Sequence, residues 1–146
     1  MIGAINQMLI FGPVFTMLLL TMLVWFYMFA RRIPFIRANK IADDKLNPSD
    51  LRQLAPAAVS NPADNLRNLF EIPPLFYFLC LYLYITFQVD LVYLGAAWIF
   101  VIFRILHSLV HCTANIVIVR FAFYAVSTGA FWFMLIISGL DFLQAT

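Results

Sequence analysis

The chain has 146 residues, of which 64% are hydrophobic and only 11% are charged. Soluble domains carry about 25% charged residues, so this composition excludes a soluble globular protein and indicates an integral membrane protein in contact with the lipid bilayer. The net charge of +2 is not accompanied by a basic run with interleaved aromatic residues, and nucleic acid is therefore not expected as a partner. The length fits a single domain over residues 1–146.

The first predicted membrane helix covers residues 8–30, an uncharged run that Arg31 and Arg32 close. At about 1.5 Å per residue it is long enough to cross a hydrocarbon core of about 30 Å. Residues 33–61 are polar and are predicted to form a loop, because prolines interrupt any long helix there. These prolines are Pro34, Pro48 and Pro56.

The second helix is predicted over residues 62–87. Asn61 and Pro62 suit its start, as a capping residue followed by proline at the first helical position. Pro73 and Pro74 lie inside this range and lack the N–H groups of the helical ladder, so a bend is expected there.

The third and fourth helices are predicted over residues 91–112 and 120–140, separated by a short connection. The fold class that follows is an all-α integral membrane protein, a bundle of four transmembrane helices joined by short hairpins. Seven of the nine Lys and Arg residues lie in or beside loop 33–61, which predicts that this loop is cytoplasmic and that both termini lie outside an inner or plasma membrane.

Polar side chains gather where this topology places the cytoplasmic ends of the helices. Residues three, four and seven positions apart share a helix face, so each helix presents one polar stripe. The candidates are Asp64, Arg67, Asn68 and Glu71 on the second helix, Arg104, His107, Ser108, His111 and Asn115 after the third apolar run, and Arg120 and Tyr124 on the fourth. A surplus of arginine over acid suits an anionic ligand, because the guanidinium fork matches a carboxylate.

Three alternatives to an anion site arise from the same residues. Glu71 could pair with Arg104, or with Arg67 four residues earlier, and tie the helices together. His107 and His111 have a spacing that can bind a metal, but Cys112 points to another face and no third ligand converges, so no metal is assigned. A haem shared between subunits is a further alternative for the two histidines.

Three short motifs carry a family resemblance. They are Arg67-Asn68-Leu69-Phe70-Glu71 followed by prolines, Arg104-Ile105-Leu106-His107-Ser108, and Arg120 sixteen residues after Arg104. In order and spacing they resemble the membrane-associated proteins in eicosanoid and glutathione metabolism, the MAPEG family, in a bacterial-type member. The resemblance implies a homotrimer of four-helix subunits with glutathione sites between neighbouring subunits at the cytoplasmic side.

The resemblance also implies roles for single residues. Arg67, Asn68 and Glu71 would hold the peptide part of glutathione, Arg104 would assist from the third helix, and Arg120 would stabilise the thiolate. His107, His111 and Tyr124 complete the expected glutathione-binding set. The expected function is then a glutathione-dependent transferase or peroxidase that acts on a lipophilic electrophile or hydroperoxide, since a cationic donor lowers the cost of forming the nucleophilic thiolate.

Two positions depart from the family pattern. Asp64 stands where the eicosanoid-forming members have an arginine, and His111 replaces an expected tyrosine. The alternative function is a non-catalytic membrane protein that binds lipid or serves as a scaffold, its intramembrane charges tying helices together.

Overall fold

The computed structural model describes residues 5–145, without the side chains of Asp44 and Ala145. Throughout this range the regular structure is helical. The elements are η1 (Gln7–Ile10), α1 (Phe11–Asn39), η2 (Asp43–Lys45), α2 (Pro48–Leu54), α3 (Ala57–Leu69), α4 (Pro73–Ile85), α5 (Leu91–Cys112) and α6 (Val117–Ala145). Four stretches are long and apolar enough to cross a membrane, namely Gln7–Asn39, Ala57–Ile85, Leu91–Cys112 and Val117–Gln144. The chain is thus a multi-pass integral membrane protein with the expected fold class.

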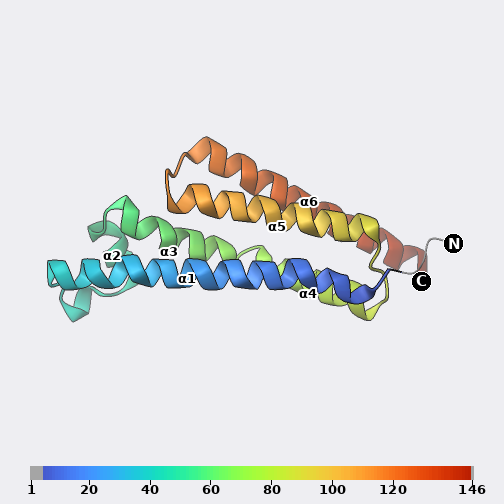
Figure 1. The fold of residues 1–146 in the computed structure, drawn as a ribbon, viewed down its shortest axis with the longest axis horizontal. Coiled ribbons are helices and arrows are strands. Elements are labelled where there is room, and N and C mark those ends of the chain that lie inside the picture. The colour runs from blue at the N-terminus through green and yellow to red at the C-terminus, as the bar shows by residue number, and fades with distance from the viewer. Residues whose placement is uncertain (1–4, 146) are drawn as a thin grey trace.

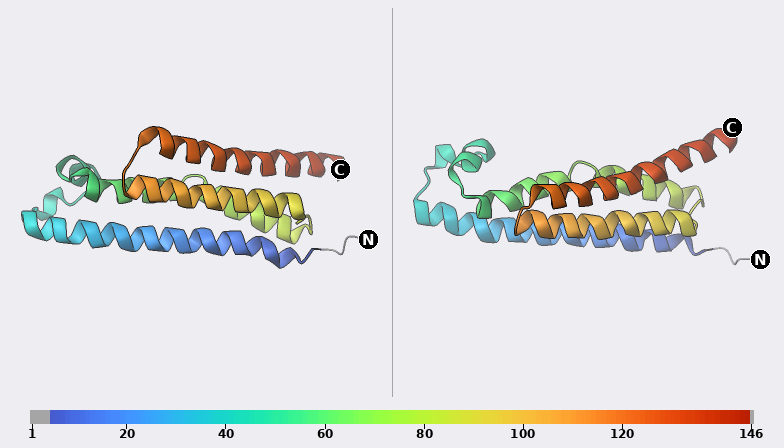
Figure 2. Two further views of the ribbon diagram at one scale, coloured as in Figure 1. Left: turned by 45° about the horizontal axis from the view of Figure 1, so that its top comes forward. Right: turned by 90° about the horizontal axis from the view of Figure 1, so that it is seen from above.

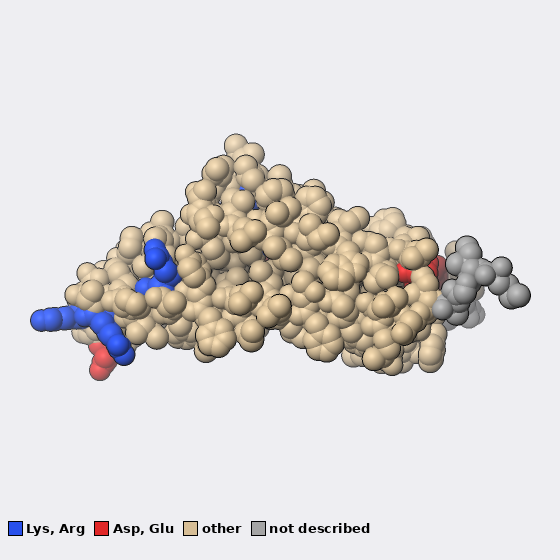
Figure 3. All heavy atoms as spheres, in the orientation of Figure 1, with Lys and Arg blue, Asp and Glu red and all other residues tan. Residues whose placement is uncertain are grey.

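The helices run roughly side by side along one long axis (Figure 1). α3 and α4 together run beside α1, while α5 and α6 form a hairpin on top of them (Figures 1 and 2). The α4–α5 connection and the end of α6 lie at one end of the bundle. We call the opposite end, which carries α2 and the α5–α6 connection, the basic end, because Lys and Arg gather there on the surface (Figure 3).

An apolar core runs between the helices. The buried residues of α1 recur every four to seven positions, as Pro13, Met17, Val24 and Met28, which places one stripe of this helix against its neighbours. Farther in, the rings of Phe76 and Phe100 stack with centroids 4.3 Å apart. The remaining large apolar side chains are mostly exposed on the outer surface, as lipid contact requires.

α1 is longer than the predicted helix of residues 8–30, because it continues through Pro34 to Asn39. Pro34 removes only one hydrogen bond from the ladder, and its side chain is exposed, so the ring does not disturb the packing. The predicted loop 33–61 is accordingly wrong in part. It contains the end of α1, all of α2 and the start of α3.

α3 begins at Ala57, and the prediction that Asn61 and Pro62 start the helix is wrong. Pro62 lies inside α3 and cannot donate to the carbonyl of Ala58 four residues earlier. Arg31 of α1 supplies the missing donor, since its Nε donates to the Ala58 carbonyl at 3.3 Å. A side chain from a neighbouring helix therefore makes the proline tolerable.

The bend expected at Pro73 and Pro74 is a complete break. α3 ends at Leu69, three residues follow in turn conformation, and α4 starts with the two prolines in its first turn. Proline suits the first turn because its missing N–H has no helical partner there in any case. Glu71 consequently lies in the link between the two helices rather than on a continuous helix face.

α6 begins three residues earlier and ends later than the predicted range 120–140. Within its added C-terminal part, Asp141 is linked to α5, because the hydroxyl of the buried Tyr93 donates to Asp141 Oδ2 at 2.8 Å. A second link closes the same end of the bundle, where the Gln7 side chain bonds both the N–H and the carbonyl of Val89.

Candidate functional site

Arg104 is the central residue of the candidate site. It lies in α5, two turns from the basic end, and its side chain is 0% exposed. Its guanidinium carbon is 4.5 Å from the centroid of the Tyr124 ring and 5.4 Å from that of Phe100. Its Nη2 donates to Thr128 Oγ1 at 3.3 Å, whereas Nε and Nη1 have no hydrogen-bond partner within the described residues. The site therefore holds a buried cation, two of whose nitrogens lack a hydrogen-bond partner among the described residues.

His107 and His111 continue the same face of α5 toward the basic end, and both are buried. His107 Nδ1 lies 2.9 Å from the backbone carbonyl of Arg120, so Nδ1 donates and Nε2 is left as an acceptor. That Nε2 and the Nδ1 of His111 have no partner among residues 5–145. The two rings meet edge to face with centroids 5.4 Å apart, and the ring of Tyr124 lies 5.7 Å from that of His107.

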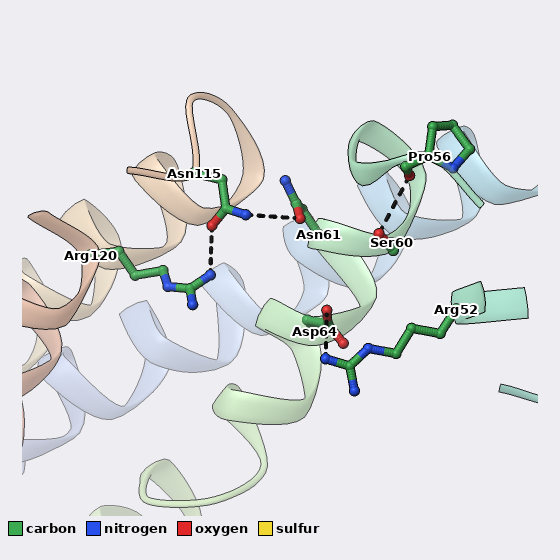
Figure 4. A network of polar contacts seen from close by, with 7 residues as sticks. All are labelled: Arg52, Pro56, Ser60, Asn61, Asp64, Asn115 and Arg120. Atoms are coloured by element: carbon green, nitrogen blue, oxygen red, sulfur yellow. Dashed lines mark hydrogen bonds and ion pairs between the residues drawn. The ribbon is translucent and has the colours of Figure 1, made fainter. Parts of the chain in front are cut away.

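Arg120 opens α6 opposite these histidines and belongs to a chain of polar contacts (Figure 4). Its Nη1 donates to Asn115 Oδ1, and Asn115 Nδ2 donates to Asn61 Oδ1 at 3.1 Å. Asn115 follows α5 in a left-handed conformation, with φ of 48°, which an asparagine adopts more readily than most residues. This chain links α3 to α6 through the α5–α6 connection.

No hydrogen bond joins the side chains of Arg67, Asn68 or Glu71 to this cluster within the described residues. Arg67 and Glu71 are exposed at the end of α3 and in the α3–α4 link, and Asn68 is half-buried. Among the described residues the one ion pair within 4 Å joins Arg52 to Asp64. Glu71 therefore forms no direct ion pair with Arg104 or Arg67 among these residues.

The structure thus divides the predicted residues into two groups. One group lies between α5 and α6 and contains the buried residues Arg104, His107 and His111 together with the half-buried Arg120 and Tyr124. The other is the exposed end of α3. Asn65, which was not among the predicted residues, connects α3 to α5, since Ser108 Oγ donates to Oδ1 of this fully buried asparagine at 3.3 Å.

The sequence contains a signal for the missed residues. Asn61, Asn65 and Asn68 follow one another at helical spacing, a stripe of amides that predicts polar contacts to a neighbouring helix. Thr128, which accepts from Arg104, lies one turn after Tyr124 on the same face of α6.

A metal centre does not find support in the same region. Across residues 5–145 no group of three or more His, Cys, Asp or Glu side chains is arranged to hold a metal ion. His107 and His111 would supply two ligands at most, and a zinc site uses at least three from the protein.

Comparison with known proteins identifies the fold family. A model of the MAPEG family matches residues 10–140, which include two of the four membrane spans in full, most of the other two, and both groups of the candidate site. No curated protein and no solved structure matches the chain significantly. The family includes glutathione transferases and peroxidases as well as other members. Since the match covers most of its length, the chain belongs to the MAPEG family.

Proposed function

We propose that the protein is a glutathione-dependent transferase or peroxidase that acts on lipophilic electrophiles or hydroperoxides at the membrane. The observation that carries the proposal is the buried guanidinium of Arg104, two of whose nitrogens lack a partner. Burying a charge without full hydrogen bonding is costly, so such donors are expected where an anionic ligand completes the site. Glutathione provides two carboxylates and, on ionisation, a thiolate.

The proposed chemistry centres on the glutathione sulfur. In conjugation the thiol loses its proton, the sulfur forms a bond to the electrophilic carbon, and the leaving group departs with the electron pair. In peroxide reduction two glutathione molecules give one disulfide, and the hydroperoxide becomes an alcohol and water. Arg120 stabilises the thiolate, and Tyr124 donates to it from one turn farther along α6.

A second copy of the chain completes the proposed site. Arg67, Asn68 and Glu71 are predicted to hold the peptide part of glutathione, yet in one chain Arg67 and Glu71 are exposed and none of the three bonds the cluster around Arg104 within the described residues. A homotrimer, the usual assembly of the family, would place the α3 end of one subunit near the α5–α6 group of another.

An apolar groove supports the choice of a lipophilic second substrate. It lies between α4 and α6 and has a volume of about 340 Å³, with Leu75, Phe78, Phe131 and Trp132 among its walls. The C-terminal part of α6 diverges from the other helices on this side (Figure 2). A hydrophobic molecule dissolved in the bilayer reaches such a groove without crossing water.

The test uses the purified protein in detergent. We expect glutathione to bind at millimolar concentration or below, and the protein to conjugate a generic aromatic electrophile or reduce a lipid hydroperoxide. Arg120→Ala should lower turnover by about a hundredfold or more, as the loss of a charge-stabilising donor does, while native mass spectrometry still detects the trimer. Arg37→Ala, an exposed arginine in α1 away from the site, is the matched control.

Two results would contradict the proposal. The first is the absence of both glutathione binding and turnover, which would favour the non-catalytic lipid-binding or scaffold protein. The second combines two observations: the unaltered protein shows no turnover, and the Arg120→Ala variant loses the trimer.

A further inference from the structure

A cavity at the basic end lies outside the α5–α6 group. It has a volume of about 150 Å³ and is enclosed by α1, α2 and α3. At about 30 Å³ for each water molecule it could take a fragment of a few heavy atoms but not a whole tripeptide. Its walls are Met28, Arg32, Phe35, Pro48, Leu51, Arg52, Ala55, Val59, Ser60, Ala63, Asp64 and Arg67.

The charged residues around this cavity carry a positive excess. Arg32, Arg52 and Arg67 stand against the single carboxylate of Asp64. Arg52 Nη2 lies 3.5 Å from Asp64 Oδ2 across the cavity (Figure 4), so this acid is already paired. Arg32 and Arg67 have no acidic partner within the described residues. Two arginines are left to attract an anion.

Arg52 itself keeps donors for a ligand. An arginine carries five N–H donors, and its contact to Asp64 is a single long one. The Arg52 side chain is 59% exposed, whereas that of Asp64 is 26% exposed. The preceding residue, Leu51, is buried, and Asn47 caps α2 by accepting from the N–H of Asp50. These contacts fix α2, and with it the place of Arg52.

We propose that this cavity binds one carboxylate of the glutathione molecule, with Arg52 as a direct ligand-binding residue beside Arg32 and Arg67. The inference rests on the proposed function, because Arg67 belongs both to this cavity and to the predicted glutathione set. Arg52 has two effects here. It donates to the carboxylate, and it cancels the charge of Asp64, which would otherwise repel the ligand.

The inference is tested by calorimetric titration of glutathione into the purified protein and its variants. Arg52→Ala should weaken binding by about tenfold, because it removes a charged donor and exposes the ligand to Asp64. Adding Asp64→Arg to this variant places a guanidinium in the same part of the cavity and should restore most of the affinity. Glutathione ethyl ester, which lacks the glycine carboxylate, shows which end of the ligand enters.

The outcomes separate this inference from the function on which it rests. If the unaltered protein binds glutathione and Arg52→Ala binds equally well, Arg52 has no ligand role, and the proposed function stands. If Arg52→Ala lowers the melting temperature without weakening binding, the ion pair only fastens α2. Absence of binding by the unaltered protein overturns both. Arg37→Ala serves again as the control for the loss of one basic residue, and its affinity should not change.

Discussion

At the scale of single residues, the site combines a buried charge with a buried hydrogen-bond network. Arg104 and His107 were predictable because charged and imidazole groups are rare in an apolar helix, and the helical repeat places them on one face. Asn65 and Thr128 were not, because small polar residues are common at membrane helix contacts and carry no charge that demands a partner. The sequence also suggested Glu71 as an acidic partner for Arg104. That expectation assumed one continuous helix, whereas Glu71 lies in the link between α3 and α4.

Arg104→Met should remove glutathione binding without lowering the melting temperature in detergent. No acid lies within 4 Å of Arg104 in the described part of the chain, so an apolar side chain of similar length leaves no unpaired charge behind. Circular dichroism during heating and calorimetric titration measure the two properties separately. A fall of several degrees in the melting temperature would show instead that Arg104 supports the fold through Thr128 and Tyr124.

Asn65→Ala should have the opposite effect. It deprives the buried hydroxyl of Ser108 of its acceptor and removes the amide that donates to Cys112 Sγ, at a cost of about 1 kcal/mol in the free energy of unfolding. The same heating experiment should show a lower melting temperature, and the same titration an unchanged affinity for glutathione. Unchanged stability would mean that these bonds between α3 and α5 are replaced by water or lipid contacts.

At the scale of elements, the prolines explain most differences between the predicted and observed helices. All four membrane helices were predictable, since long apolar runs need no knowledge of the tertiary structure. The boundaries of the third helix were also correct, as α5 covers Leu91–Cys112, but those of the other three helices were not. Whether a proline ends a helix depends on whether another group donates to the carbonyl four residues before it. For Pro62 that donor is Arg31, which lies 31 residues earlier in the chain and on another helix. Pro34 faces outward and needs no such partner.

The Arg31 and Pro62 contact predicts a non-additive pair of mutations. Arg31→Ala should cost about 1 kcal/mol in the free energy of unfolding, because the Ala58 carbonyl loses its donor. In a Pro62→Ala background the new backbone N–H can bond this carbonyl, so the same Arg31 change should cost only a few tenths of a kcal/mol. Denaturant titration in mixed micelles measures all four proteins. Equal costs in both backgrounds would rule out the capping role of Arg31.

At the scale of the whole molecule, charge is distributed unevenly along the long axis. Lys and Arg gather at the basic end, and the surface between the two ends carries little charge in the view of Figure 3. The composition was sufficient to predict a membrane bundle of four helices. It could not show that α1 and α2 extend past the α5–α6 hairpin, because that depends on how the helices are staggered (Figure 1).

The basic end is predicted to face the cytoplasm. The test uses two proteins without Cys80 and Cys112, one with Ala38→Cys near the end of α1 and one with Gln144→Cys near the end of α6, both at exposed positions. A membrane-impermeant maleimide should label position 144 in right-side-out vesicles and position 38 in inside-out vesicles. The reversed pattern would overturn the predicted orientation.

The length of α1 has a consequence for how catalysis would be measured. Its 29 residues span about 43 Å, roughly 13 Å more than a hydrocarbon core, so the cavity beside α2 lies in the headgroup and water layer. Arg104 lies about 12 Å inside the basic end of α5. A polar thiol can then enter from water while its reaction partner stays dissolved in lipid. The proposed reaction would therefore follow surface-dilution kinetics, in which added inert lipid slows turnover at a constant total amount of electrophile.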